Sequence, residues 1–348
     1  MNLLVTGGAG FIGSHFIRHN LSRPQVKRLV NLACLTYAGN VANLEEAVRD
    51  PRYVFEKVNL RNRAEVKRVV AEHEITHVVH LAAESHVDRS IVGPSDFVET
   101  NVLGTFHLLE ACRGFWLGSR GHRFTPRFLH VSTDEVYGSL GNDGCFTEST
   151  PYAPNSPYSA SKAGSDLLVR AYGRTYGLPV VITNCSNNYG PYQYPEKLIP
   201  VVIRRVLARQ CVPVYGDGLQ VRDWLHVRDH VEALWQLLER GRDGETYNLG
   251  GLNQWPNLRL VERVCDLLDE LAPDRHQASR NLITHVADRP GHDRRYAIDI
   301  SKVQAELGWK PTVDFDTGLR ETAQWYLEHE DWLKQAIQRL EANQVIGS

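Results

Sequence analysis

The 348-residue sequence predicts an α/β fold, with a doubly wound parallel sheet that carries helices on both faces and a smaller, mixed α/β C-terminal lobe. Three observations predict this fold. Short apolar runs alternate with helical patterns in the N-terminal half, a glycine-rich turn follows the first run, and prolines break the chain into shorter pieces after about Gly190. A hydrophobic content of 42% is ordinary for a protein with a sizeable core.

Six apolar runs in the N-terminal half are expected to form the strands of the sheet. They are Leu3–Thr6, Arg28–Leu32, Tyr53–Val58, His77–Ala82, Arg127–Ser132 and Val180–Cys185. Apolar residues at helical spacing lie between them, and the two longest helical patterns are Asp96–Cys112 and Ser159–Tyr176. In the C-terminal part Asp223–Arg240 is helix-rich, while Asn257–Leu271 and Ser301–Leu307 are predicted to be amphipathic helices. The residues after Trp325 read as a charged helix.

Charge and composition exclude several classes of function. The formal net charge of −2 provides no basic field for nucleic acid. No apolar run approaches the ~18 residues of a membrane span, and the chain starts without a basic leader, so we expect a cytoplasmic protein. The six cysteines are dispersed without metal-ligand spacing, which predicts free, buried thiols and no metal site.

The first strand runs into a turn in which Gly7, Gly10 and Gly13 stand at the spacing G-x-x-G-x-x-G. Glycine permits the tight turn and a close approach of a pyrophosphate, while the N-terminus of the following helix supplies hydrogen-bond donors. Because the turn lies between a strand and an amphipathic helix, it predicts a Rossmann-type dinucleotide site rather than a merely tight turn. We expect the dinucleotide-binding domain at 1–190, with 221–248 returning to it, a substrate-binding lobe at 191–220 and 249–330, and a C-terminal helix or tail at 331–348.

Position 33, at the end of the second strand, departs from this pattern. An acidic residue is expected there to accept hydrogen bonds from the adenosine ribose, but the residue is Ala33. Its absence weakens NAD binding unless another group replaces it, and it also removes the repulsion that excludes a 2′-phosphate. No arginine follows at 34–36 to hold such a phosphate, so NAD is preferred over NADP.

Two segments carry the chemistry. Tyr158 and Lys162 form a Y-x-x-x-K pair on one helix face, where the ammonium group is expected to lower the pKa of the phenol and make it a usable base. Thr133, Asp134 and Glu135 follow the strand at Arg127–Ser132, at the edge of a parallel sheet where ligands bind. Either signal alone is common, but together with the glycine-rich turn they point to the short-chain dehydrogenase arrangement.

The sequence resembles the dTDP-glucose 4,6-dehydratases, of the extended short-chain dehydrogenase type, over roughly residues 1–328. The resemblance rests on these segments: Thr6–Ser14, Leu35–Asn40, Leu81–Ser90, Ser132–Gly138, Asn184–Pro191, Pro195–Pro200, Arg222–Trp224 and Ala287–Asp293. The Thr-Asp-Glu triplet discriminates, because the related sugar-nucleotide epimerases lack the acidic pair. The resemblance implies NAD as cofactor, a nucleotide-sugar substrate, and a homodimer that pairs the two long helices.

The implied reaction begins with oxidation of the glucose C4. Tyr158, helped by Thr133, takes the proton of the 4-hydroxyl, while Lys162 tunes Tyr158 and holds the nicotinamide ribose. Glu135 then removes the C5 proton, and Asp134 protonates the departing 6-hydroxyl, so the two carboxyl groups must differ in pKa. Return of hydride to C6 gives a 4-keto-6-deoxy sugar.

The resemblance also implies binding residues. The cofactor set comprises Gly7, Gly10, Phe11, Ile12, Gly13, Thr36, Asn59, Leu60, Leu81, Ala82, Ala83, Ser85, Thr100, Tyr158, Lys162 and Asn188. The substrate set comprises Ser85, Thr133, Asn187, Lys197, Leu198, Pro213, Tyr215, Arg222, Asn257, Asp288 and His292. Asn59 departs from the family, which usually has aspartate there. From the residues alone, Arg222 could instead pair with Asp223, and Asn257 could cap the helix that follows it.

Other functions stay open at this level. A nucleotide-sugar 4-epimerase or a UDP-glucose 4,6-dehydratase would share most of these motifs. Ala33 and Asn59 could also mark a pseudoenzyme that binds sugar nucleotide, although the complete set of catalytic residues argues against this.

Overall fold

The computed structural model describes residues 1–36, 38–118, 125–275 and 277–346. Tyr37, which is part of the Leu35–Asn40 motif, and residues 347–348 of the predicted tail lie outside the described residues. Seven parallel strands form the central sheet in the order β10-β6-β5-β4-β1-β2-β3. Their bounds are β1 (Asn2–Thr6), β2 (Arg28–Leu32), β3 (Tyr53–Glu56), β4 (His77–His80), β5 (Arg127–Thr133), β6 (Val180–Cys185) and β10 (Thr246–Leu249).

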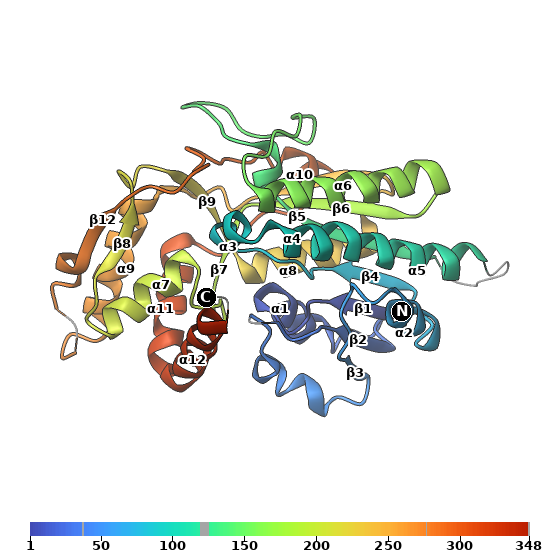
Figure 1. The fold of residues 1–348 in the computed structure, drawn as a ribbon, viewed down its shortest axis with the longest axis horizontal. Coiled ribbons are helices and arrows are strands. Elements are labelled where there is room, and N and C mark those ends of the chain that lie inside the picture. Colours follow the sequence, from blue (N-terminus) through green and yellow to red (C-terminus); the bar gives the residue numbers. More distant parts are fainter. Residues whose placement is uncertain (37, 119–124, 276, 347–348) are drawn as a thin grey trace.

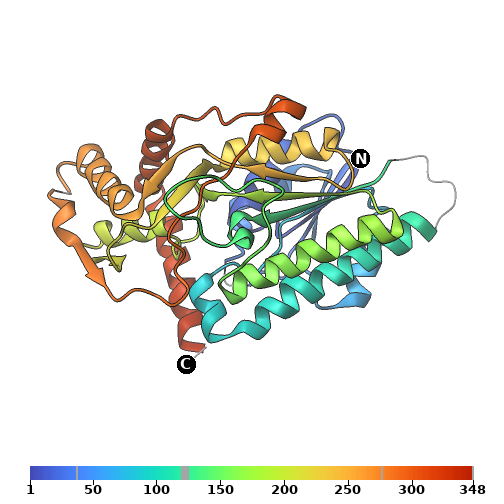
Figure 2. The same cartoon turned by 90° about the horizontal axis from the view of Figure 1, so that it is seen from above.

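Helices cover both faces of this sheet, which confirms the predicted fold class (Figures 1 and 2). Leu3 and Val5 of β1 belong to one core with the helices α1, α8 and α10, whereas Leu4 belongs to the other core with α2, α5 and α6. Successive side chains of a strand point to opposite faces, so a sheet buried on both sides needs continuous apolar runs. The sequence has such runs.

The helices have the following bounds: α1 (Phe11–Asn20), α2 (Arg63–Glu72), α3 (Val87–Val92), α4 (Pro94–Phe97), α5 (Thr105–Gly118), α6 (Pro157–Tyr176), α7 (Leu198–Leu207), α8 (Val227–Arg240), α9 (Asn257–Leu271), α10 (Ser301–Leu307), α11 (Phe315–Glu328) and α12 (Glu330–Ile346). The predictions for α9 and α10 are correct to the residue. None of the helices in the described part of the chain is both long and apolar enough to cross a membrane.

The smaller lobe lies at the left of Figure 1 and contains two small sheets. One has the order β11-β9-β7 and the other pairs β12 with β8. Their strands are β7 (Asn187–Tyr189), β8 (Val212–Tyr215), β9 (Val221–His226), β11 (Gln254–Pro256) and β12 (Ile283–Val286). β10 belongs to the central sheet and α8 packs against it, although β9, which precedes α8, belongs to the three-stranded sheet of the smaller lobe.

Three local predictions need correction. The helix predicted at Asp96–Cys112 contains a π-helical segment, Val98–Gly104, in which the side chain of Asn101 binds both backbone groups of Glu84. The first residues of the helix-rich Asp223–Arg240 segment are strand, because β9 pairs with β7 and β11. All six cysteines are free, as predicted, but Cys34 is half-buried, and Cys145 and Cys211 are exposed rather than buried.

Candidate active site

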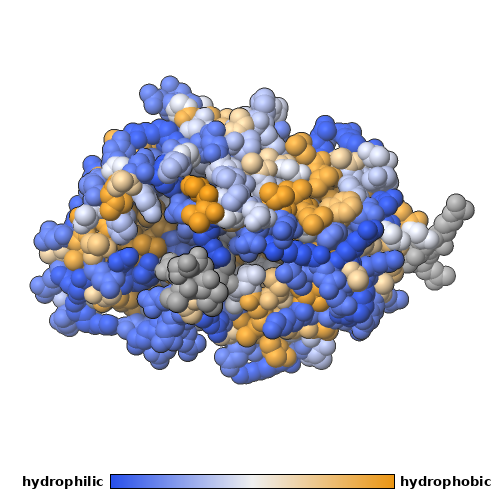
Figure 3. Space-filling model, viewed as in Figure 1, coloured by the Kyte–Doolittle hydropathy of each residue, from blue (hydrophilic) through white to orange (hydrophobic). Residues whose placement is uncertain are grey.

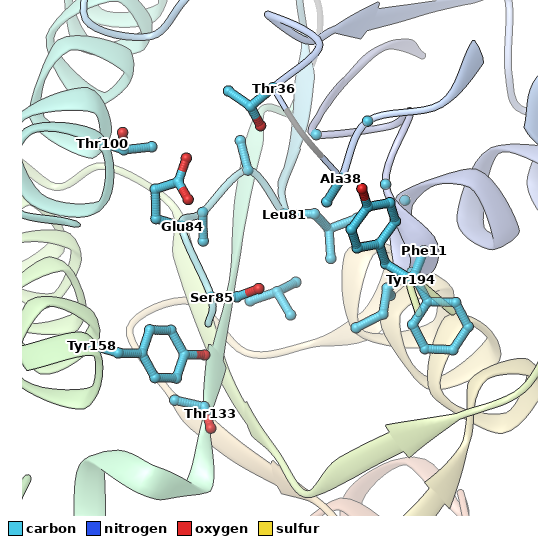
Figure 4. A pocket seen from close by; sticks show the side chains of 18 of the residues that line it. Phe11, Thr36, Ala38, Leu81, Glu84, Ser85, Thr100, Thr133, Tyr158 and Tyr194 are labelled. Atoms are coloured by element: carbon cyan, nitrogen blue, oxygen red, sulfur yellow. The ribbon is translucent and has the colours of Figure 1, made fainter. Parts of the chain in front are cut away.

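A cavity of about 630 Å³ opens at the carboxyl ends of the central strands. The predicted cofactor residues line it with the exception of Leu60, which is buried just behind Asn59. Among the predicted substrate residues, Ser85, Thr133, Asn187 and Lys197 line it as well. Figure 4 shows Tyr158 and Thr133 together at one end of the cavity and Phe11 and Tyr194 at the opposite side. The tertiary structure therefore brings the glycine-rich turn and the catalytic candidates to one space.

The glycine-rich turn approaches other backbone segments closely. Gly7 has a φ of +70°, and a Cβ atom there would lie 2.8 Å from the backbone of Ala82. A Cβ atom on Gly13 would lie 2.3 Å from the carbonyl oxygen of Gly7. Any side chain at these positions would displace the turn from the cavity wall, so the turn fits a dinucleotide that approaches the backbone of the first helix.

Tyr158 and Lys162 are positioned by the start of α6. Ser156 caps this helix in a reciprocal capping box with Ser159, and Pro157 occupies its first turn. Tyr158 therefore lies in the first turn and Lys162 one turn later, and both are buried. The Nζ atom of Lys162 donates a hydrogen bond to the carbonyl oxygen of Val131 at 2.8 Å.

The predicted lowering of the Tyr158 pKa is wrong for the protein alone. Burial raises the pKa of Tyr158 well above its ordinary value, and the nearby Glu135 carboxyl raises it further, whereas a hydrogen bond with Thr133 opposes the shift. Burial also lowers the pKa of Lys162. Helical spacing placed the two groups correctly but could not show that both are removed from water.

Asp134 and Glu135 lie in a 3-10 helix, Asp134–Tyr137, that begins directly after β5. The side chain of Thr133 caps this helix and accepts a hydrogen bond from the backbone N–H of Glu135 at 3.2 Å. Asp134 is only 1% exposed, and its Oδ2 atom has no hydrogen-bond partner in the structure. Both residues line the cavity, Asp134 as a buried and Glu135 as a half-buried residue.

The two carboxyl groups have different electrostatic surroundings. Burial raises the pKa of Asp134 well above its ordinary value, and the charges of Glu135 and Asp223 raise it further. Burial also raises the pKa of Glu135, but three cations, Arg222, Arg289 and Lys197, oppose that shift. These surroundings favour the protonated form of Asp134 more strongly than the protonated form of Glu135.

The remaining predicted substrate residues lie outside the wall of this cavity, in the smaller lobe. Leu198 begins α7, directly after Lys197, while Pro213 and Tyr215 belong to β8. The Tyr215 ring meets the His292 ring edge-on, and Asp288 accepts hydrogen bonds from Gln220 and bonds to His292.

Neither simple structural role considered for Arg222 and Asn257 occurs. Arg222 does not pair with Asp223: its guanidinium group donates to the carbonyl oxygens of Val221 and Asp293 and lies 4.1 Å from the centre of the Tyr296 ring. Asn257 makes no cap hydrogen bond in α9, and its buried Oδ1 atom has no hydrogen-bond partner among the residues that the structure describes. The alternative roles drawn from the residues alone are therefore wrong for both side chains.

Sequence reasoning missed part of the cavity wall. The missed residues are Ala9, Cys34, Leu35, Ala38, Gly39, Arg61, Glu84, Arg89, Asp96, Val131, Ser132, Cys185, Ser186, Gln193, Tyr194 and Glu196. Many directly follow a strand or flank a predicted residue, which was a usable signal. Tyr194 gave no such signal; it packs with Ala38 against Ala336 and Leu340 of α12, so the C-terminal helix supports the wall.

A parallel sheet with a glycine-rich turn and a buried Tyr–Lys pair beside one cavity defines an enzyme of the short-chain dehydrogenase type. Comparisons with known proteins agree. Residues 4–322 match the family described as GDP-mannose 4,6 dehydratase. A dTDP-glucose 4,6-dehydratase of Neisseria meningitidis is 54% identical over 341 residues, covering 96% of each chain. One of Escherichia coli K12 is 52% identical over 343 residues, covering 96% of this chain and 94% of the relative.

Solved structures are similar over nearly the whole chain. The dTDP-glucose 4,6-dehydratase DesIV of Streptomyces venezuelae, solved with NAD bound, has a TM-score of 0.90 and 47% identity, covering 97% of this chain and all of that one. A UDP-glucose 4-epimerase of Thermus thermophilus, also with NAD, has a TM-score of 0.83 and 31% identity, covering 94% and 100%. The chain belongs to the dTDP-glucose 4,6-dehydratase family.

Proposed function

We propose that this protein is a dTDP-glucose 4,6-dehydratase, which converts dTDP-glucose to dTDP-4-keto-6-deoxyglucose and water with NAD as an internal hydride carrier. The observation that carries the proposal is the pair of adjacent acids, buried Asp134 and half-buried Glu135, which line the same cavity as Tyr158. An epimerase needs no such acid–base pair, because it removes no water.

The cavity fits NAD. The glycine-rich turn leaves room for a pyrophosphate against the backbone, and the cavity continues from Gly10 to Lys162. When bound, NAD supplies a reversible hydride acceptor. The predicted cofactor residues would hold it, with Lys162 at the nicotinamide ribose and Ala33 beside the adenosine ribose.

Tyr158 acts as the base for the glucose 4-hydroxyl proton, and Thr133 holds that hydroxyl in place. Lys162 favours the ionised phenol, because a positive charge nearby lowers the free energy of tyrosinate. In the protein alone burial raises the pKa of Tyr158, and the positive charge of a bound nicotinamide ring would oppose this shift.

Elimination of water requires an acid and a base at the same time. The 4-ketone makes the C5 hydrogen acidic, so the Glu135 carboxylate removes that proton. Asp134 keeps its own proton because it is buried beside Glu135, and its unpartnered Oδ2 atom is free to donate to the leaving 6-hydroxyl. Glu135 returns the proton to C5, and the hydride taken from C4, which bound NAD would return to C6, completes the conversion.

We propose that residues 1–190 and 221–248 form the dinucleotide-binding domain, apart from β7 and β9, which belong to a sheet of the smaller lobe. Residues 191–220 and 249–330 form the substrate-binding lobe, apart from α10, which packs against the central sheet, and residues 331–346 form a C-terminal helix. The nucleotide of the substrate would extend from Asn187 and Lys197 toward Arg222, whose planar guanidinium suits a diphosphate. The cluster of Tyr215, Asn257, Asp288 and His292 would hold the far end.

One assay tests the function. Purified protein is incubated with dTDP-glucose or UDP-glucose, with and without added NAD, and the product is followed by mass. Loss of 18 mass units from dTDP-glucose is expected. A product of unchanged mass that chromatography identifies as the galactose epimer would favour a 4-epimerase. Dehydration of UDP-glucose alone would favour the UDP-specific enzyme, and binding without conversion would indicate a pseudoenzyme.

We further propose a cytoplasmic homodimer. The neighbouring helices α5 and α6 and the adjoining π-helical segment expose apolar side chains, notably Val98, Leu103, Leu167 and Tyr176. Figure 3 shows an apolar patch over this region. Light scattering is expected to give twice the chain mass, and Leu167→Arg to give a monomer; a monomeric parent protein would contradict the proposal.

A further inference from the structure

Behind the catalytic pair lies a buried acid that the proposed mechanism does not use. Asp166 follows Lys162 by one turn of α6 and Tyr158 by two turns, so the three side chains share one side of the helix. Asp166 is 1% exposed and Lys162 is 4% exposed. Burying a carboxyl group costs free energy unless hydrogen bonds compensate for the lost water, so the hydrogen-bond partners of Asp166 indicate its role.

Four hydrogen-bond donors converge on the Asp166 carboxyl group. His130 Nε2 reaches Oδ1 at 3.0 Å, and Oδ2 accepts from Ser132 Oγ at 2.8 Å, Tyr152 OH at 3.1 Å and Asn184 Nδ2 at 3.3 Å. An ionised carboxylate accepts hydrogen bonds only, and this set provides donors on both oxygens. The arrangement suits a buried anion.

Two of these donors, Ser132 and Asn184, connect Asp166 to the end of β5, the strand that leads into the acid–base pair. Ser132 lies directly before Thr133 in β5. The same amide nitrogen of Asn184 that donates to Asp166 also donates to the carbonyl oxygen of Thr133 at 3.1 Å. Asp166 therefore links α6, which carries Tyr158, to the backbone that directly precedes Asp134.

Asp166 also supplies a counter-charge for Lys162. Burial lowers the pKa of Lys162, and the Asp166 charge is the largest opposing effect. The other titratable groups that interact with Lys162 come from β4, β5 and β6, and burial holds each of them neutral: it lowers the pKa of His80 and of His130 and raises the pKa of Cys185 to about 12. Tyr158, on the same helix, is neutral for the same reason.

We propose that Asp166 is a positioning residue: it keeps Lys162 protonated in its buried site and fixes the end of β5 relative to α6. The proposal rests on the proposed function for its kinetic consequences. If it is correct, removing the charge while keeping the shape changes the pH profile as well as the rate.

The first test is Asp166→Asn, assayed with dTDP-glucose. Without the anion, Lys162 loses its proton at a lower pH, so the alkaline limb of kcat/KM is expected to move down by about one pH unit. A displaced strand end is expected to lower kcat by about tenfold or more. KM for dTDP-glucose is expected to change little, because the nucleotide end lies in the smaller lobe.

Tyr152→Phe is the matched control. It removes one donor to Asp166 but leaves the carboxylate in place, so its alkaline limb is expected to coincide with that of the parent protein. A folded Asp166→Asn variant whose limb does not move, or a control whose limb moves equally, would overturn the proposal.

A second measurement is independent of activity. Denaturant unfolding is compared for Asp166→Asn alone and combined with Lys162→Met, because an unpaired buried ammonium group is strongly destabilising and an apolar side chain is not. We expect Asp166→Asn to lower the free energy of unfolding less in the Lys162→Met protein than in the parent protein. If the single variant is insoluble, we expect the double variant to be soluble and folded. Equal losses in both backgrounds, or absence of rescue, would overturn the proposal even if the dehydratase function itself fails.

Discussion

Replacing Ala33 by aspartate is expected to tighten NAD binding. Ala33 directly follows β2 and lines the cavity, where the acid expected by the dinucleotide pattern would accept hydrogen bonds from the ribose. Hydrogen bonds to a charged group contribute about 1.5–3 kcal/mol. Because Ala33 is only 8% exposed, dehydration of the new carboxylate offsets part of this gain. We expect a net gain of about 1.4 kcal/mol, which is a tenfold lower dissociation constant.

Titration calorimetry of the cofactor-free protein measures this directly. Ala33→Asn is the matched control, since it offers a neutral acceptor of the same length and is expected to tighten binding by only about threefold. NADP is expected to bind Ala33→Asp more weakly than the parent protein, because the carboxylate repels a 2′-phosphate. Equal NAD affinities for the parent and both variants would refute the reasoning.

Three further predictions concern the acid–base pair and the glycine-rich turn. Glu135→Gln is expected to oxidise C4 but to stall before water loss, and normal dehydration in a product mass assay would contradict its role as base. Asp134→Asn is expected to abolish dehydration but to raise the melting temperature at pH 8. Because the pKa of Asp134 is raised in the folded protein, this carboxyl group destabilises the fold at every pH at which it is ionised in the unfolded chain. The gain in melting temperature should therefore vanish below about pH 3.9. Gly13→Ala is expected to weaken NAD binding and lower stability, because its Cβ atom would lie 2.3 Å from the carbonyl oxygen of Gly7. Gly114→Ala is the control: it has open space around it and should stabilise α5 by up to about 1 kcal/mol. Unchanged NAD affinity in the Gly13→Ala variant would show that the glycine-rich turn is not the cofactor site.

The strands of the central sheet were predictable because a sheet covered on both faces requires continuous apolar runs, and each run is local in the sequence. The smaller lobe was less predictable. β9 is a strand because β7 and β11 pair with it, and these partners lie more than 30 residues away on either side. The π-helical turn at Val98–Gly104 depends on Asn101 binding a loop that follows a different strand.

The sequence by itself determined the identity and spacing of the reactive groups: the glycine-rich turn, the Tyr158–Lys162 pair and the adjacent acids. Helical and strand periodicities are local, so these patterns fix which side chains share a face. Only the tertiary structure decided how deeply each group is buried and what charges surround it. Burial and neighbouring charges raise the pKa values of Tyr158 and Asp134, and the charge of Asp166 opposes the lowering of the Lys162 pKa, because electrostatic free energies depend on distances in space.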